Sequence, residues 1–124
     1  MEYPVMIVDD DPSVCSAVVR FMEYAKIPVV AVESGKACLE ELKKGFKGLI
    51  LMDVIMPEMD GWDTIKEMVN RGFPEGVIVC MLTGKEVPDA KMDELKEYVM
   101  DYIRKPFDYA KLVKIVREYL SYLD

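Results

Sequence analysis

The stretch that decides the fold is the apolar run Leu49-Ile50-Leu51-Met52, followed at once by Asp53-Val54-Ile55-Met56-Pro57-Glu58-Met59-Asp60-Gly61. An apolar run this short, bounded by turn residues, predicts a strand that is buried on both faces. Asp53 ends this strand and opens a turn rich in Pro, Asp and Gly. A carboxylate delivered to that position is a candidate nucleophile or metal ligand.

Outward from this stretch, short apolar runs alternate with segments in which apolar residues recur at helical spacing. The predicted strands cover residues 5–8, 28–32, 49–52, 77–82 and 99–103. The predicted helices cover about residues 12–25, 35–44, 61–69, 88–96 and 109–120, and the first three have Asp11, Ser34 and Asp60 as N-caps. Five strand–helix repeats predict an α/β fold of the (βα)5 type, a doubly wound parallel sheet with right-handed crossovers and helices on both faces.

Polar residues follow several of the predicted strands directly. Asp9 and Asp10 follow the first strand, Asp53 the third and Thr83 the fourth, and Lys105 lies just beyond the fifth. Parallel sheets place their ligand sites outside the carboxyl ends of the strands, where the strand order reverses. We therefore expect these side chains to meet at one edge of the sheet.

Three carboxylates that are brought close together repel one another unless a cation lies among them. Mg²⁺ is the expected cation, because it prefers hard oxygen ligands and is usually held by one or two carboxylates together with phosphate oxygens. Asp9, Asp10 and Asp53 are the expected metal ligands, and the backbone carbonyl of Ile55 is expected to add another. Asp11 directly precedes a proline and is assigned to the helix cap, outside the site.

A metal ion, a lysine and a hydroxyl are suited to phosphoryl transfer, in which the protein mainly positions the reactants and neutralises charge. Asp53 is the predicted nucleophile and would become an aspartyl phosphate. Lys105 supplies positive charge, and the hydroxyl of Thr83 can donate to an incoming oxygen. Because an acyl phosphate hydrolyses readily, this chemistry favours a timed signal over a metabolic product.

The composition limits the classes of function. A chain of 124 residues with 52% hydrophobic content predicts one domain, residues 1–124. The formal net charge of −7 argues against direct nucleic acid binding. No apolar run approaches the roughly 20 residues of a membrane span, and the N-terminus lacks the regions of a signal peptide. A cytoplasmic location without membrane association is expected.

The chain has three cysteines and no histidine. Cys15, Cys38 and Cys80 are widely separated and lie in apolar segments, so we expect buried free thiols instead of disulfides or a metal site. The absence of histidine excludes Ser-His-Asp and Cys-His catalysis. If the donor of the phosphoryl group is a phosphohistidine, that residue must therefore belong to a partner protein.

Taken together, these stretches resemble the receiver domain of response regulators in two-component signalling, of the chemotaxis-regulator-like kind. The resemblance runs from the first strand to the last helix and implies a flavodoxin-like strand order, 2-1-3-4-5. The matching stretches are Ile7-Val8-Asp9-Asp10-Asp11-Pro12, Asp53-Val54-Ile55-Met56-Pro57-Glu58-Met59-Asp60-Gly61, Leu82-Thr83-Gly84, and Asp101-Tyr102-Ile103-Arg104-Lys105-Pro106-Phe107.

This resemblance implies a role for each site residue. Asp53 is the phosphorylated residue, Asp9 and Asp10 hold Mg²⁺, and Lys105 pairs with the phosphoryl group. The implied partners are a sensor histidine kinase or histidine phosphotransfer protein, and a downstream target protein of unknown identity. The domain would promote only its own phosphorylation and dephosphorylation, as a phosphoacceptor of a phosphorelay and not as an enzyme acting on other molecules.

Thr83 and Tyr102 are implied to be the switch residues, which alter the surface formed by the fourth helix, fifth strand and fifth helix. A phosphorylation-dependent homodimer is a further implied outcome. The family often has a cis bond at the place of Lys105-Pro106. Two positions depart from its usual pattern: Gly84 follows the switch hydroxyl where alanine is common, and Tyr98 stands where a glycine is common. Gly84 predicts a short-lived phosphate, and Tyr98 predicts an altered end of the fourth helix.

Three alternatives remain open from the sequence. An aspartyl-phosphate phosphatase with a similar sheet would need an acid two residues after the nucleophile, where this chain has Ile55. A docking module that works without phosphorylation would not need the intact site residues. The receiver could also be cut from a larger regulator or hybrid kinase, although the ending of the chain just after the last helix favours a stand-alone protein.

Overall fold

Strands and helices alternate throughout the part of the chain that the computed structural model describes, residues 2–84 and 90–124. The strands are β1 (Val5–Val8), β2 (Val29–Val32), β3 (Gly48–Asp53), β4 (Val77–Thr83) and β5 (Val99–Arg104). The helices are α1 (Pro12–Tyr24), α2 (Gly35–Lys43), α3 (Gly61–Asn70), α4 (Ala90–Leu95) and α5 (Tyr109–Ser121), with a 3₁₀ turn at Lys96–Tyr98 between α4 and β5.

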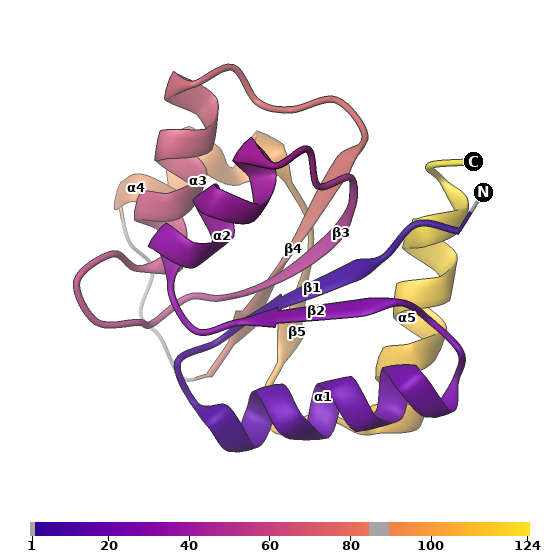
Figure 1. Cartoon of the computed structure of the whole chain (residues 1–124). Helices are drawn as coiled ribbons and strands as arrows, with labels where there is room; N and C mark the ends of the chain where they lie inside the picture. Colours follow the sequence, from indigo (N-terminus) through magenta and orange to yellow (C-terminus); the bar gives the residue numbers. More distant parts are fainter. Residues whose placement is uncertain (1, 85–89) are drawn as a thin grey trace.

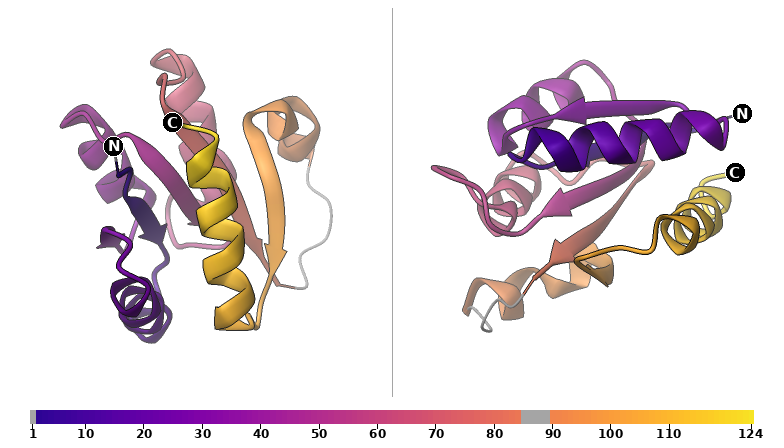
Figure 2. Two further views of the ribbon diagram at one scale, coloured as in Figure 1. Left: turned by 90° about the vertical axis from the view of Figure 1, so that its right-hand side faces the viewer. Right: turned by 90° about the horizontal axis from the view of Figure 1, so that it is seen from below.

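All pairings in the sheet are parallel, and the strand order is β2-β1-β3-β4-β5. Helices α1 and α5 cover one face of the sheet, and α2, α3 and α4 cover the other (Figures 1 and 2). The predicted doubly wound, flavodoxin-like architecture is confirmed. The strand order reverses between β1 and β3, so the ends of these two strands flank the switch point at which such sheets bind ligands.

The central strands are continuously apolar because helices cover both faces of the sheet. Successive strand residues face opposite sides, so Met6 and Ile50 lie in the core beneath α2 and α3, whereas Ile7 and Leu51 lie in the core beneath α1 and α5. All four side chains are fully buried. Strands with one wet face would instead alternate between apolar and polar residues.

The predicted caps are present at the starts of three helices. The side chains of Asp11, Ser34 and Asp60 each accept a backbone N–H two or three residues later, at 2.9, 3.0 and 2.7 Å. Asp63 returns the bond to the backbone N–H of Asp60 at 3.1 Å, which completes a capping box. These bonds set the starting points of the helices that follow β1, β2 and β3.

The fourth helix differs most from its prediction. The predicted start at Pro88 lies outside the described residues, and α4 ends at Leu95 and continues as a 3₁₀ turn to Tyr98. The ring of Tyr98 stacks on Phe73, with centroids 5.2 Å apart. This contact joins the 3₁₀ turn to the segment that follows α3.

Strand ends were predicted one residue too short in three places. Asp53, Thr83 and Arg104 belong to β3, β4 and β5, because Asp53 pairs with Leu82 and Thr83 pairs with Arg104 in the ladder. Backbone pairing continues as long as the neighbouring strand is present, whereas the apolar pattern ends where the sheet meets the site. The prediction of three buried free cysteines is confirmed.

Candidate functional site

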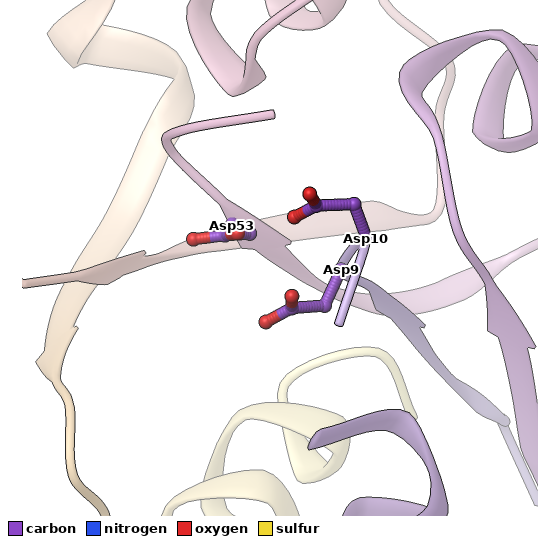
Figure 3. A group of neighbouring side chains, drawn as sticks. All are labelled: Asp9, Asp10 and Asp53. Carbon is purple, nitrogen blue, oxygen red and sulfur yellow. The ribbon is translucent and has the colours of Figure 1, made fainter. Parts of the chain in front are cut away.

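The predicted site residues come from the carboxyl ends of four strands. Asp9 and Asp10 directly follow β1, Asp53 and Thr83 are the last residues of β3 and β4, and Lys105 directly follows β5. Because the strands are parallel, these ends lie along one edge of the sheet. Figure 3 shows the three carboxylates grouped there beyond the ends of β1 and β3.

Asp9, Asp10 and Asp53 form a compact acidic cluster, in which one ligand oxygen of each residue lies within 4.8 Å of the others. Asp9 is completely buried and Asp53 is 6% exposed, whereas Asp10 faces solvent. Burial is the largest cause that raises the pKa of Asp53, and the neighbouring charge of Asp9 adds to it, so that this pKa reaches about 6. Like charges at this separation make the fully ionised cluster electrostatically unfavourable.

Lys105 partly neutralises this cluster. Its Nζ donates to Asp9 Oδ2 at 2.7 Å and to Asp53 Oδ1 at 3.1 Å. Burial by itself lowers the pKa of Lys105, but the hydrogen bonds and charges of the two carboxylates outweigh this effect and raise the pKa. The lysine is held in its charged form between the two buried acids.

The remaining polar atoms of Asp9 are also bonded, so this residue is held in place from every side. Its Oδ1 accepts the backbone N–H of Asp11 at 2.9 Å, and its own N–H donates to the carbonyl of Val32 at 3.1 Å. The thiol of Cys15 donates to the carbonyl of Asp9 at a sulfur–oxygen distance of 3.3 Å. Cys15 was predicted only as a core residue, and no local sequence signal indicated this contact.

The loop between β3 and α3 packs directly against Asp53. Gly61 donates its N–H to the carbonyl of Val54 at 2.8 Å. A Cβ at Gly61 would lie 2.4 Å from the backbone carbonyl oxygen of Asp53, so only glycine fits there. The sequence indicated a turn and a helix start at Asp60-Gly61 but not this close approach to the predicted nucleophile.

Thr83 and Ile55 belong to segments that adjoin the residues of the acidic cluster and Lys105. Thr83 is half-buried, and its carbonyl accepts the backbone N–H of Lys105 at 2.7 Å, which ties the ends of β4 and β5 together. Ile55 is 65% exposed, and the only group of this residue that could serve as a metal ligand is its backbone carbonyl. The Lys105-Pro106 bond is cis, as the family resemblance implied.

Tyr102 lies away from the carboxylates, on the face of the sheet that α3 and α4 cover. It pairs with Met81 in the β4–β5 ladder, and its ring is 37% exposed. The centroid of this ring is 6.4 Å from that of Trp62, the single tryptophan of the chain. Burial raises the pKa of Tyr102. The structure thus brings together the three acids and Lys105. Thr83 is joined to Lys105 through the backbone, and Tyr102 packs near Trp62 of α3.

The chain matches known proteins over almost all of its length. Residues 5–117 match the family model described as the response regulator receiver domain. The transcriptional regulatory protein ZraR of Klebsiella oxytoca is 30% identical over 118 residues, which cover 95% of this chain but 26% of that protein. This chain therefore spans about a quarter of the length of that curated relative. No helix among the described residues is long and apolar enough to cross a membrane.

Solved structures give the same result. A CheY-like response regulator receiver domain protein from Methanospirillum hungatei JF-1 is 43% identical with a TM-score of 0.93, and the match covers 99% of this chain and 98% of that chain. The N-terminal domain of a response regulator receiver protein from Methanoculleus marisnigri JR1 is 30% identical with a TM-score of 0.72, covering 96% and 97% of the two chains. The fold, the clustered acids and these matches agree, and the chain belongs to the family of response regulator receiver domains of two-component systems.

Proposed function

We propose that residues 1–124 form a single receiver domain that accepts a phosphoryl group on Asp53 from a phosphohistidine of a sensor histidine kinase or histidine phosphotransfer protein. The observation that carries this proposal is the contact of Lys105 with both Asp9 and Asp53 at the end of the sheet. It places a charged ammonium group at a buried carboxylate that has an exposed acid, Asp10, beside it. The proposal concerns the receiver chemistry, whether these residues act alone or within a longer regulator.

The donor set of the cluster fits Mg²⁺. Three carboxylate oxygens within 4.8 Å of one another supply hard oxygen ligands and no nitrogen or sulfur. Asp9, Asp10 and Asp53 would hold the ion, and the carbonyl of Ile55 would add a ligand. Bound Mg²⁺ would supply positive charge to the phosphoryl oxygens and relieve the repulsion among the carboxylates.

In the proposed transfer, a carboxylate oxygen of Asp53 attacks phosphorus. The new O–P bond forms as the N–P bond of the partner's phosphohistidine breaks, and the bonding electron pair stays on the imidazole nitrogen, which takes up a proton from water. The ammonium group of Lys105 moves from the carboxylates to a phosphoryl oxygen, and the hydroxyl of Thr83 donates to another. The product is an aspartyl phosphate at Asp53, the last residue of β3.

Intact-mass spectrometry with acetyl phosphate as donor tests this proposal. With Mg²⁺ the protein should gain one phosphoryl group, and the gain should be absent with a chelator or in Asp53→Asn. Asp108→Asn is a matched control, because Asp108 is an exposed helix cap whose role asparagine can fill. A phosphoryl gain that persisted in Asp53→Asn would refute the assignment, and no gain in the folded, unaltered protein would favour a docking module that works without phosphorylation.

The proposed output is a shift between two arrangements of Thr83 and Tyr102. Phosphoryl oxygens interact differently with the two positions of the Thr83 hydroxyl, so phosphorylation biases a pre-existing equilibrium and alters the surface of α4, β5 and α5. That surface would bind a downstream target or a second copy of the phosphorylated domain. The position of Tyr102 beside Trp62 supports this proposal, because the residue is 37% exposed and therefore only partly enclosed by its neighbours.

Trp62 fluorescence can follow this shift, since its indole is 4% exposed and lies beside Tyr102. Phosphorylation should change the emission of the unaltered protein. Thr83→Ala should still be phosphorylated but should lose most of that change, whereas Ser121→Ala, which removes a hydroxyl from the far end of α5, should keep it. An undiminished change in phosphorylated Thr83→Ala would show that the hydroxyl does not couple the phosphate to Tyr102.

A further inference from the structure

Asp101 of β5 carries a carboxylate on the face of the sheet that α5 covers. Asp101 is two residues before Ile103, so both side chains face the side of the sheet on which Leu112 and Val116 of α5 pack. Asp101 pairs with Cys80, which belongs to the same core. Asp101 is half-buried at this position, and hydrogen bonds offset the cost of partly removing its charge from water.

The position of Asp101 results from an irregularity in the ladder between β4 and β5. Val79 pairs with Val99, but the next residue, Cys80, pairs with Asp101, so Met100 is left without a partner in the register. Met100 is 48% exposed. A shift of one residue exchanges the two faces of a strand, and this shift turns Asp101 toward α5 and Tyr102 toward α3.

The carboxylate of Asp101 accepts two hydrogen bonds, one from helix α5 and one from within strand β5. Its Oδ2 accepts the hydroxyl of Tyr119 in α5 at 2.6 Å, and its Oδ1 accepts the backbone N–H of Tyr102 at 2.8 Å. The Tyr119 bond has the short length of a bond to an ionised acceptor. The hydrogen bond to Asp101 is also the largest cause that raises the pKa of Tyr119.

These bonds tie the backbone of the proposed switch residue to the last helix. Strand β5 is at the edge of the sheet, where N–H groups that point outward have no neighbouring strand. At Tyr102 this N–H is bonded by the side chain of the preceding residue. A rearrangement of Tyr102 that shifts its backbone must therefore move the Asp101 carboxylate, and with it the hydroxyl of Tyr119.

We propose that Asp101 is a positioning residue that transmits the rearrangement of Tyr102 to α5 through the hydroxyl of Tyr119. This inference rests on the proposed phosphorylation of Asp53 and specifies how the signal leaves β5. Helix α5 responds because one of its side chains is hydrogen-bonded to the switch strand, in addition to the apolar packing that holds the helix on the sheet.

Hydrogen–deuterium exchange of residues 109–121 tests the link, with acetyl phosphate and Mg²⁺ in excess and the phosphorylated fraction read from the intact mass of the same samples. Tyr119→Phe removes the hydroxyl and keeps the ring. Tyr122→Phe is the matched control, because its hydroxyl bonds Glu118 within the same terminal part of the chain, at 3.2 Å, and not β5. Asp101→Asn is a second variant that weakens the link between β5 and α5, since an amide offers one acceptor oxygen where the carboxylate offers two.

In the unaltered protein and in Tyr122→Phe, phosphorylation should change the exchange of α5. Tyr119→Phe and Asp101→Asn should gain the phosphoryl group to the same extent, yet the change in α5 should be at least twofold smaller. A full change in phosphorylated Tyr119→Phe, or no change in α5 of the phosphorylated unaltered protein, would overturn the inference. Absence of the phosphoryl mass itself would overturn the proposed function and the inference together, and the intact mass distinguishes this case.

Discussion

Replacing Asp53 with asparagine should stabilise the metal-free protein. Asp53 is 6% exposed and lies within 4.8 Å of two other carboxylates, which makes its negative charge costly in the folded state. Asparagine keeps the shape of the side chain and an oxygen that can accept from Lys105, but it carries no charge. The variant proposed to block phosphorylation should therefore be more stable than the unaltered protein, which is the opposite of most substitutions of buried residues.

The expected size follows from the pKa of Asp53. Folding raises it from 3.8 to about 6, and each pKa unit corresponds to about 1.4 kcal/mol. The ionised carboxylate thus disfavours folding by about 3 kcal/mol, and Asp53→Asn should raise the free energy of unfolding by about 2 to 3 kcal/mol near pH 7.

The pH dependence has a defined sign. Because the folded pKa lies above the unfolded one, the folded protein binds the extra proton between about pH 4 and pH 6, and its stability falls as the pH rises through this window. The loss is complete about one pH unit above the folded pKa, near pH 7. The stability advantage of Asp53→Asn should therefore be small near pH 4 and reach its full size near pH 7.

Urea unfolding in the presence of a chelator, followed by circular dichroism from pH 4 to 8, measures this difference. Asp108→Asn makes the same change of net charge at an exposed cap and should stay within about 0.5 kcal/mol of the unaltered protein. Added Mg²⁺ should stabilise the unaltered protein more than Asp53→Asn, since the proposed metal site loses a carboxylate in this variant. Equal or lower stability of Asp53→Asn at pH 7 without metal would refute the argument from burial and repulsion.

Three further substitutions test the site. Lys105→Met removes the ion-pair partner of the fully buried Asp9 and should lower the free energy of unfolding by about 3 to 5 kcal/mol, measured by urea unfolding with chelator. A decrease below about 1 kcal/mol would show that the stability of buried Asp9 does not depend on the lysine. Gly61→Ala places a Cβ 2.4 Å from the carbonyl oxygen of Asp53 and should cost about 1 to 3 kcal/mol, whereas Lys66→Ala on the exposed side of α3 should be near neutral. Gly84→Ala should slow the loss of the phosphoryl group, because a methyl group restricts the backbone at this position and the approach of water. Intact mass after removal of acetyl phosphate measures this rate, and an unchanged half-life of the phosphorylated protein would contradict the prediction.

Local sequence patterns predicted most of the architecture. Apolar runs bounded by acids and turn residues marked every strand, and Asp11, Ser34 and Asp60 marked the helix starts, because caps and apolar periodicity depend on residues a few positions apart. The sequence also predicted that the site lies at the carboxyl ends of the strands, since parallel strands bring these ends together. Local patterns did not predict the 3₁₀ turn at Lys96–Tyr98 that follows α4, where the ring of Tyr98 packs on Phe73.

The composition of the site was predictable, but its internal bonding was not. The order of strand ends indicated that Asp9, Asp53 and Lys105 would meet. That Lys105 contacts both acids, at separations of 96 and 52 positions along the chain, depends on the packing of three strands and on the side-chain conformations it allows. The raised pKa of Asp53 has the same origin, because burial and the position of Asp9 determine it.

The sequence by itself therefore determined the alternation of strands and helices, the N-caps Asp11, Ser34 and Asp60, and the acids and lysine at the carboxyl ends of the strands, because each of these depends on local patterns and on the direction of the strands. Only the tertiary structure decided which groups touch. The shifted register of β5 turns Asp101 toward Tyr119, and the approach of α3 leaves no room for a side chain at Gly61. Such contacts depend on distances of a few ångströms between segments far apart in the chain, and the packing of the core sets those distances.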